Sequence, residues 1–241
     1  MMIVMLATLF LSVSVSYADG PVATYEVIIT NLTDGQAFSP PVVLTHRRAT
    51  HIFRVGLAAS PEIQEIAENG NNSPILAALT GDRHVFDFTQ VAEGNADPAP
   101  LIPAGNPGGV PFQSSATYVV TADRGAKFLS LAMMLICTND GFSGIDSLRL
   151  PKKIGESVTV HTAGYDAGTE INTEDFADLV PPCQALIGVM SDDPGTGMTN
   201  PALAETDVIR HHPGIQGGED LIPGVHGWTD PVAEIVITRI D

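Results

Sequence analysis

Basic residues are scarce in this chain of 241 residues, which has 11 Lys and Arg against 28 Asp and Glu. The formal net charge of −17 repels phosphate backbones and anionic membrane surfaces. Proteins that bind nucleic acid are normally basic over at least one face, and the overall balance here has the opposite sign. We therefore expect no nucleic-acid partner.

The motifs of several common catalytic sites are also missing. The nearest match to a G-x-S-x-G nucleophile elbow, residues 141–144, has the wrong spacing. No H-E-x-x-H occurs, and the pairs His46/His51 and His211/His212 have no Cys or acid at a known ligand spacing. One Trp and four Tyr are few for a glycosidase, which normally binds sugars on aromatic residues. These absences favour a protein that is not an enzyme.

Cysteine is limited to Cys137 and Cys183. A single pair in an exported domain is typical of one disulfide bond, and two buried thiols are the alternative. A bridge closing a loop of this length would stabilise the fold by about 4 kcal/mol if it acts through chain entropy. It would also connect the segment around Ala185 to the strand end before Asp140.

An apolar N-terminal segment, residues 1–18, has the pattern of a secretory signal peptide with Ser16 and Ala18 at the cleavage site. A transmembrane anchor is the alternative, but the apolar stretch is barely long enough to span a bilayer. The segment lacks the usual basic residue before its apolar core. We expect a secreted or periplasmic protein, cleaved near Ala18, with no integral membrane segment in the mature chain.

Glycine and proline are abundant, with 23 and 18 residues, and only 16% of residues are charged. This composition is typical of short strands joined by many turns. No charged or low-complexity linker divides residues 19–241, so we expect one domain.

Local patterns predict the individual elements of this domain. Residues 60–70 form the clearest helix, with a Ser60 cap, Gly70 at the end and Glu62, Glu65 and Glu68 on a solvated face. The segments 138–147, 94–113 and 191–201 are predicted loops. Further helices are predicted at 73–79 and 172–179, the latter with Glu174 and Asp175 near its start. Strands are predicted at 24–30, 42–45, 51–57, 118–122, 128–137, 156–162 and 233–240, and residues 82–89 are a strand or extended loop.

Three carboxylates follow two of these strands. Asp140 lies after strand 128–137, and Asp166 and Glu170 lie after strand 156–162. If the two strands are neighbours, their exit loops meet at one edge, where carboxylates and loop carbonyls can bind Ca²⁺. The alternative is ordinary turn chemistry, since Asn-Asp-Gly and Asp-Ala-Gly-Thr are common turn sequences. No EF-hand loop is present.

The sequence resembles the spondin domain, the amino-terminal module of F-spondin and mindin, and is closer to the bacterial members. The resemblance rests on residues 25–46, 55–71, 139–148, 165–170 and the closing strand 231–240, YEVIITNLTDGQAFSPPVVLTH, VGLAASPEIQEIAENGN, NDGFSGIDSL, YDAGTE and PVAEIVITRI. Together these blocks extend over nearly all of the expected mature chain.

The resemblance implies an all-β fold, an antiparallel β-sandwich similar to a C2 domain, with one or two short helices in the connections. It also implies a calcium site in which Asp140, Asp166 and Glu170 match the family's three acids. Glu170 replaces an Asp, which keeps the charge and lengthens the side chain.

The function implied by the resemblance is that of a secreted, non-catalytic module for extracellular adhesion or ligand binding, whose partner is an unknown extracellular protein or glycan. The alternative is a metal-dependent hydrolase that uses the same cation, for which His161 is the available general base.

Overall fold

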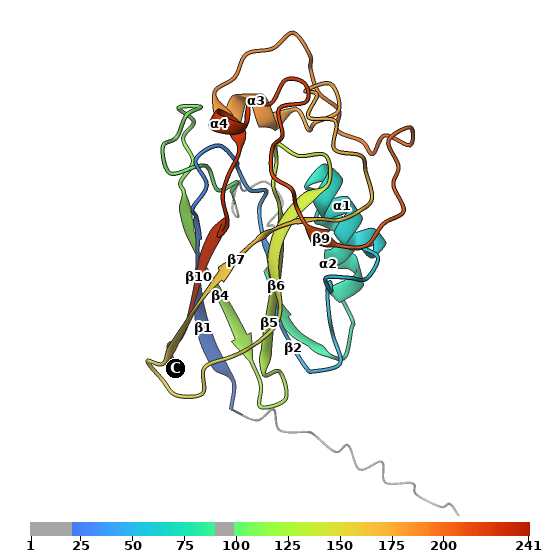
Figure 1. Ribbon diagram of the computed structural model, residues 1–241. Coiled ribbons are helices and arrows are strands. Elements are labelled where there is room, and N and C mark those ends of the chain that lie inside the picture. Colours follow the sequence, from blue (N-terminus) through green and yellow to red (C-terminus); the bar gives the residue numbers. More distant parts are fainter. Residues whose placement is uncertain (1–20, 90–98) are drawn as a thin grey trace, which may run out of the picture.

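Two antiparallel sheets pack face to face in the computed structural model, which describes residues 21–89 and 99–241 (Figure 1). The four-stranded sheet has the order β4-β1-β10-β7, and the six-stranded sheet has the order β3-β2-β5-β6-β8-β9. The expected antiparallel β-sandwich is confirmed, and the described residues contain four short helices where one or two were expected. The expected signal peptide lies outside the described residues.

The element bounds follow the predicted segments closely over much of the chain. The four-stranded sheet contains β1 (Ala23–Asn31), β4 (Ser115–Ala122), β7 (Ser157–Thr162) and β10 (Ala233–Arg239). The six-stranded sheet contains β2 (Val42–His46), β3 (Val85–Phe88), β5 (Phe128–Met134), β6 (Gly141–Arg149), β8 (Gly164–Asp166) and β9 (Arg210–His211). The helices are α1 (Pro61–Asn69), α2 (Ser73–Leu79), α3 (Pro182–Ile187) and α4 (Pro223–His226).

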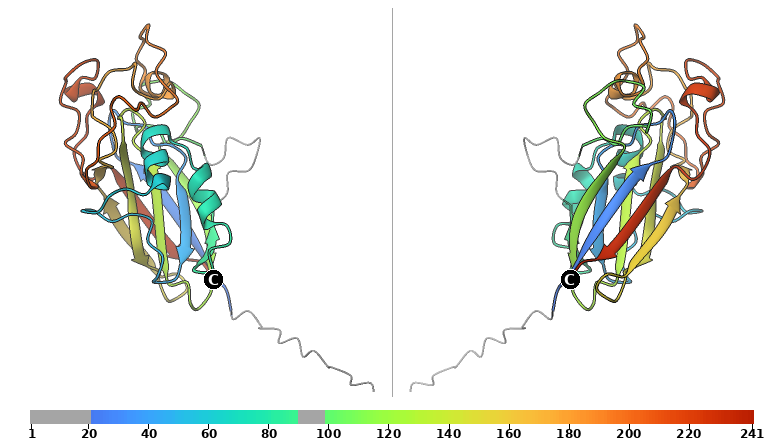
Figure 2. Two further views of the ribbon diagram at one scale, coloured as in Figure 1. Left: turned by 90° about the vertical axis from the view of Figure 1, so that its right-hand side faces the viewer. Right: turned by 90° about the vertical axis from the view of Figure 1, so that its left-hand side faces the viewer.

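The core between the sheets is built from strands with alternating burial. In β1, Val27 and Ile29 point inward, as Ile235 and Ile237 do in β10, while the residues between them are only partly buried. In β5, by contrast, every residue after Phe128 is buried. Helix α1 packs on the outer face of β5, so that strand has apolar neighbours on both sides (Figure 2).

Helix α1 begins and ends at the predicted signals. The Ser60 hydroxyl accepts a hydrogen bond from the Ile63 amide, which the first turn of a helix leaves without a partner. Gly70 ends the helix with φ of 62°, in the left-handed region that glycine adopts without strain. Ile63 and Ile66 are fully buried against the six-stranded sheet. The prediction of a solvated Glu68 is wrong, because this side chain is buried as well.

The disulfide prediction is confirmed. Cys137 and Cys183 are bonded, with Cα atoms 5.1 Å apart and a sequence separation of 46. Both cysteines are buried in an apolar cluster between the end of β5 and helix α3, together with Leu179 and Leu186. The bridge therefore fixes α3 to the chain just before Asp140.

Three predicted elements differ in the structure. Residues 51–57 are not a strand; Asp146 accepts hydrogen bonds from the Ile52 amide and the His51 ring, so a side chain holds this segment in place of a strand ladder. Residues 172–179 form turns and no helix. Most of the predicted loop 138–147 belongs to strand β6.

The sequence analysis missed strand β6 because the strand contains glycines, which are also typical of turns. Gly144 is required inside the sheet because a Cβ atom there would lie 2.2 Å from the Leu131 carbonyl oxygen on β5. Strand β5 correspondingly ends at Met134, earlier than the predicted Cys137. In the described part of the chain, no helix has the length and apolar character needed to cross a bilayer.

Candidate metal centre

The loops that carry the three predicted acids meet at one edge of the six-stranded sheet. Asp140 directly precedes β6, Asp166 ends β8, and these strands pair with Gly141 opposite Asp166. The Ala167 amide also donates to the Asp140 carbonyl oxygen at 3.1 Å. Asp140 and Asp166 are thus brought to the same edge, and the backbone amide of Glu170 lies 3.1 Å from Asp140 Oδ2.

The reason for this proximity differs from the expected one. The prediction assumed that β5 and β7 are neighbours, but they lie in different sheets. After β7 the chain crosses at Ala163 to the six-stranded sheet, where β8 pairs with β6. This crossing, which local sequence patterns do not reveal, carries Asp166 to Asp140.

Asp140 is completely buried, and only one of its two carboxylate oxygens has hydrogen-bond partners in the described structure. Its Oδ2 atom accepts hydrogen bonds from the amides of Thr169 and Glu170, at 2.8 and 3.1 Å. Its Oδ1 atom has no hydrogen-bond partner in the described structure. Burial and the nearby charge of Asp166 together raise the pKa of Asp140 from 3.8 to about 7, although the hydrogen bonds from Thr169 and Glu170 act in the opposite direction.

Asp166 is also completely buried, but both of its oxygen atoms have partners. Oδ1 accepts from the Gly168 amide at 2.8 Å. Oδ2 accepts from Asn172 Nδ2 at 2.9 Å and from Arg210 Nη2 at 3.1 Å. Arg210 lies on β9 and also pairs with Glu205 and Asp207 on the protein surface. This arginine supplies positive charge to the site, and sequence reasoning missed it because β9 has only two residues.

Glu170 lies near a further buried acid, Glu68. Its Oε1 atom accepts from the Asn200 amide at 3.0 Å. Burial, together with the charges of Glu68, Asp140 and Asp178, raises the pKa of Glu170 from 4.5 to about 7, although the hydrogen bond from the Asn200 amide lowers it. Deprotonation of two of the three predicted ligands, Asp140 and Glu170, therefore costs free energy near neutral pH.

This edge has the chemistry of a site for a hard cation. Three carboxylates are buried in these loops, Arg210 pairs with one of them, Asp166, and one carboxylate oxygen of Asp140 has no donor in the described structure. A buried polar atom without a partner costs about 1–3 kcal/mol, so a ligand that satisfied it would stabilise the fold. Carboxylate and carbonyl oxygens are the ligands that Ca²⁺ prefers, but in the described structure the ligand atoms of Asp140, Asp166 and Glu170 do not all lie within 4.8 Å of one another.

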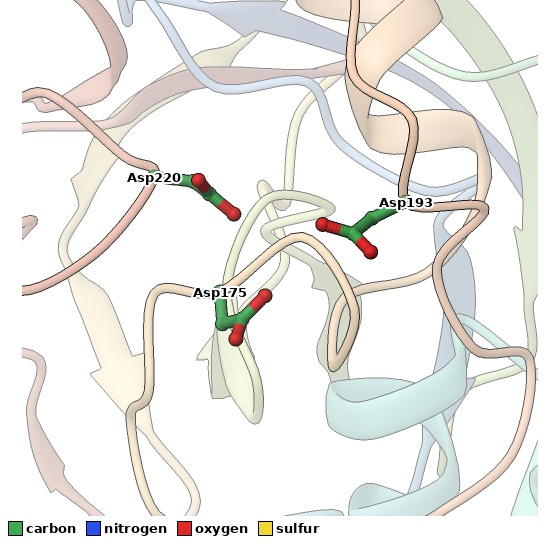
Figure 3. Close-up of side chains that lie close together, drawn as sticks. All are labelled: Asp175, Asp193 and Asp220. Atoms are coloured by element: carbon green, nitrogen blue, oxygen red, sulfur yellow. The ribbon is translucent and has the colours of Figure 1, made fainter.

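A separate group of acids lies on the surface nearby. Asp175, Asp193 and Asp220 come from three different loops and direct their carboxylates toward one another (Figure 3). One oxygen from each lies within 4.8 Å of the others, and among the described residues this is the group of three potential metal ligands that meets that distance. Asp140, Asp166 and Glu170 are not part of it. The exposed triad could hold a metal, and the sequence analysis missed it because its members are far apart along the chain.

Loop contacts already use part of this triad. Asp175 Oδ1 accepts from the Ala177 amide and Asp220 Oδ2 from the Phe176 amide, both at 2.9 Å. The first is the contact of an ordinary turn, and the second joins two loops that are 44 residues apart in the sequence. Asp193 makes no side-chain hydrogen bond in the described structure, and it is exposed.

Glu174 organises the neighbouring loop, in place of the predicted role at a helix start. Its carboxylate accepts hydrogen bonds from the amides of Gln216, Gly217 and Gly218, at 2.5, 2.6 and 2.9 Å. Its own backbone is left-handed, with φ of 61°, which is uncommon for a residue other than glycine. The carboxylate therefore replaces secondary structure as the anchor of residues 216–218.

We expect Glu174→Gln to lower the free energy of unfolding by about 1–3 kcal/mol, because the amide nitrogen of Gln would face backbone donors where an acceptor is needed. Urea unfolding of the parent and the variant measures this difference. Glu219→Gln, an exposed change of the same kind in the same loop, is the control and should leave the midpoint unchanged. Equal midpoints for both variants would contradict the anchoring role.

Comparison with known proteins places this geometry in context. The Spondin_N family model matches residues 30–175, which is more than half of the chain. The matched region contains Asp140, Asp166, Glu170 and the disulfide partner Cys137, while Arg210 lies beyond it. A comparison with curated proteins gave no significant match.

Proposed function

Because the chain belongs to the Spondin_N family, an extracellular adhesion-type module, we propose that it is an exported, non-catalytic domain that binds one Ca²⁺ ion. The proposed ligands are Asp140, Asp166 and Glu170. The ion holds the two acidic loops in one arrangement, and the ordered edge contacts an extracellular protein or glycan. We further propose that residues 19–241 fold as one unit.

The unpaired Oδ1 atom of Asp140 is the observation that carries this proposal. Asp140 and Asp166 are both fully buried, and two negative charges that are shielded from water repel each other. A divalent cation would offset both carboxylates and would occupy the position for which the fold supplies no donor. The family match and the disulfide also fit an extracellular protein.

Arg210 has a defined part in this proposal. Its guanidinium already pairs with Asp166, and its other contacts, Glu205 and Asp207, lie at the surface. An arriving cation would compete with Arg210 for Asp166, and the surface acids could retain the arginine when it moves outward. Arg210 would then stabilise the loops without metal and yield its place when calcium binds.

Thermal unfolding during a calcium titration tests the site. With free Ca²⁺ at 100 times its dissociation constant, we expect the folded state to gain about 2.7 kcal/mol, since the ion binds the folded state alone. The gain should be reversed by a chelator and should be absent from Asp140→Asn, which keeps the size of the side chain and removes its charge.

Asp193→Asn is the matched control, because it removes one charge from the exposed triad. We expect this variant to respond to calcium like the parent. A response that is lost in Asp193→Asn and retained in Asp140→Asn would assign the ion to the triad and contradict the proposed ligand set.

The hydrolase alternative gains no support from the position of His161. This residue lies on β7 in the four-stranded sheet, where its Nε2 atom is 3.3 Å from Glu234 Oε2 on the neighbouring strand β10. A general base must reach the reacting group near the metal, and His161 belongs to the other sheet.

A further inference from the structure

A cavity of about 480 Å³ lies at the end of the sandwich remote from the acidic loops. Strand β6 connects the two ends, since Asp140 precedes its first residue and Arg149, which lines the cavity, is its last. The remaining walls come from the start of β1, the turn between β4 and β5, and the last residues of β10, near the C-terminus marked in Figure 1. This volume suits a small organic molecule.

The lining contains an unusual share of the protein's positive charge. Five of the 11 basic residues in the sequence border this cavity, against one acid, Asp123. They are Arg124, Lys127, Arg149, Lys152 and Arg239. With 28 acidic and 11 basic residues in the sequence, a random distribution would place more acids than bases around a cavity.

The carboxylates near the cavity are already engaged elsewhere. Asp123 pairs with Arg47 at 2.8 Å and accepts from the Gly125 and Ala126 amides. Asp241 accepts from the amide and hydroxyl of Thr24. The Glu156 carboxylate accepts from two backbone amides in its own turn.

In the described structure, most of these cations are not paired with a carboxylate in a salt bridge. Within residues 21–89 and 99–241, Arg124, Lys127, Arg149 and Lys152 form no salt bridge. All four are exposed at the mouth of the cavity. Arg239 donates hydrogen bonds to the Lys152 carbonyl oxygen and to the backbone oxygen of Asp241.

The inner wall of the cavity is apolar. Ala23, Ala122, Ala126 and Leu150 are buried there, and they offer no side-chain hydrogen-bonding groups. Tyr25 also lines it, but its hydroxyl already donates to the Pro151 carbonyl oxygen at 3.1 Å. A ligand that fits must therefore place an apolar body against this wall and an anionic group among the cations at the mouth.

We propose that this cavity binds a soluble organic phosphate or sulfate ester with a short apolar body. Guanidinium groups bind phosphate and sulfate oxygens through paired hydrogen bonds, and lysines add charge at the same position. This second site is independent of the calcium proposal, because none of its lining residues belongs to the acidic edge.

Calorimetric titration of the purified protein with n-hexyl phosphate tests the proposal. We expect binding that weakens as salt is added, and an affinity about tenfold lower in the double variant Arg124→Gln/Arg149→Gln, because each lost charge-assisted hydrogen bond weakens binding. The double variant Arg54→Gln/Arg83→Gln has the same change in net charge at exposed sites outside the cavity, and its affinity should equal that of the parent.

Four further probes identify the source of the affinity. n-Hexanol should not bind, since it lacks the anion, and inorganic phosphate should bind more weakly than the ester, since it lacks the apolar body. Binding to dextran sulfate or to phosphatidylglycerol vesicles, together with no binding of n-hexyl phosphate, would overturn the proposal. Equal affinities of the two double variants would also overturn it. If the Arg124→Gln/Arg149→Gln protein unfolds at the assay temperature, Lys127→Gln provides the same test with a smaller loss.

Discussion

Removing the disulfide with the double substitution Cys137→Ala/Cys183→Ala is expected to lower the free energy of unfolding by about 4 kcal/mol. The bond closes a loop with a sequence separation of 46, so its loss frees a long segment of the unfolded chain. The two small side chains also leave space in a buried cluster, which adds to the loss. Urea unfolding of the oxidised parent and the variant measures the difference.

Reduction of the parent provides the control for this prediction. The reduced parent should unfold at a urea concentration between those of the oxidised parent and the variant, because it lacks the bond but keeps both buried side chains. If reduction left the midpoint unchanged, or if mass measurement found two alkylated thiols in the untreated protein, the stabilising bond would be contradicted. The variant should also bind calcium more weakly under the proposed function, since Cys137 lies three residues before Asp140.

Stability without metal should fall as pH rises from about 4 to about 7. The pKa of Asp140 is raised from 3.8 to about 7 by burial and by Asp166, and that of Glu170 from 4.5 to about 7 by burial and by neighbouring acids. In this window the folded protein keeps protons that the unfolded chain has released, so deprotonation favours unfolding. Each pKa unit corresponds to about 1.4 kcal/mol, which gives on the order of 4 kcal/mol for Asp140 alone.

Urea unfolding at a series of pH values, in the presence of a chelator, measures this slope. Asp140→Asn should be much less sensitive to pH, because it cannot titrate and its amide oxygen can still accept from Thr169 and Glu170. Under the proposed function, calcium should stabilise the parent more at pH 8 than at pH 5, where protons compete for the same carboxylates. A metal-free parent whose stability rises between pH 4 and 7 would contradict the raised pKa values.

Local sequence patterns predicted the parts of the fold whose signals are contained in one segment. The alternating burial of β1 and β10 and the caps of α1 at Ser60 and Gly70 are examples, because strand and helix periods and cap chemistry are local properties. The family resemblance supplied the acidic residues and the sandwich. Neither source could give the pairing of β8 with β6, which depends on where the whole chain crosses between sheets.

The elements that were missed depend on contacts between distant residues. Strand β6 contains Gly144 because of the backbone of β5, a reason that lies on another strand. Glu68 was expected to be solvated from its place on α1, but Thr199 donates to it at 2.5 Å from a loop far along the chain. Arg210 reaches Asp166 from a strand that is too short to show a period. In each case the tertiary neighbour decides the role of the residue.

The passage of one extended segment from β7 to β8 has a mechanical consequence for the molecule. Here the two sheets are joined by a single residue, Ala163, which lies between the end of β7 and the start of β8. If one layer were to slide over the other, this stretch would have to lengthen, and a covalent chain resists that far more than side-chain packing does. A force applied to β10, the partner of β7, should therefore be transmitted through β7 and β8 to Asp166 at the acidic edge.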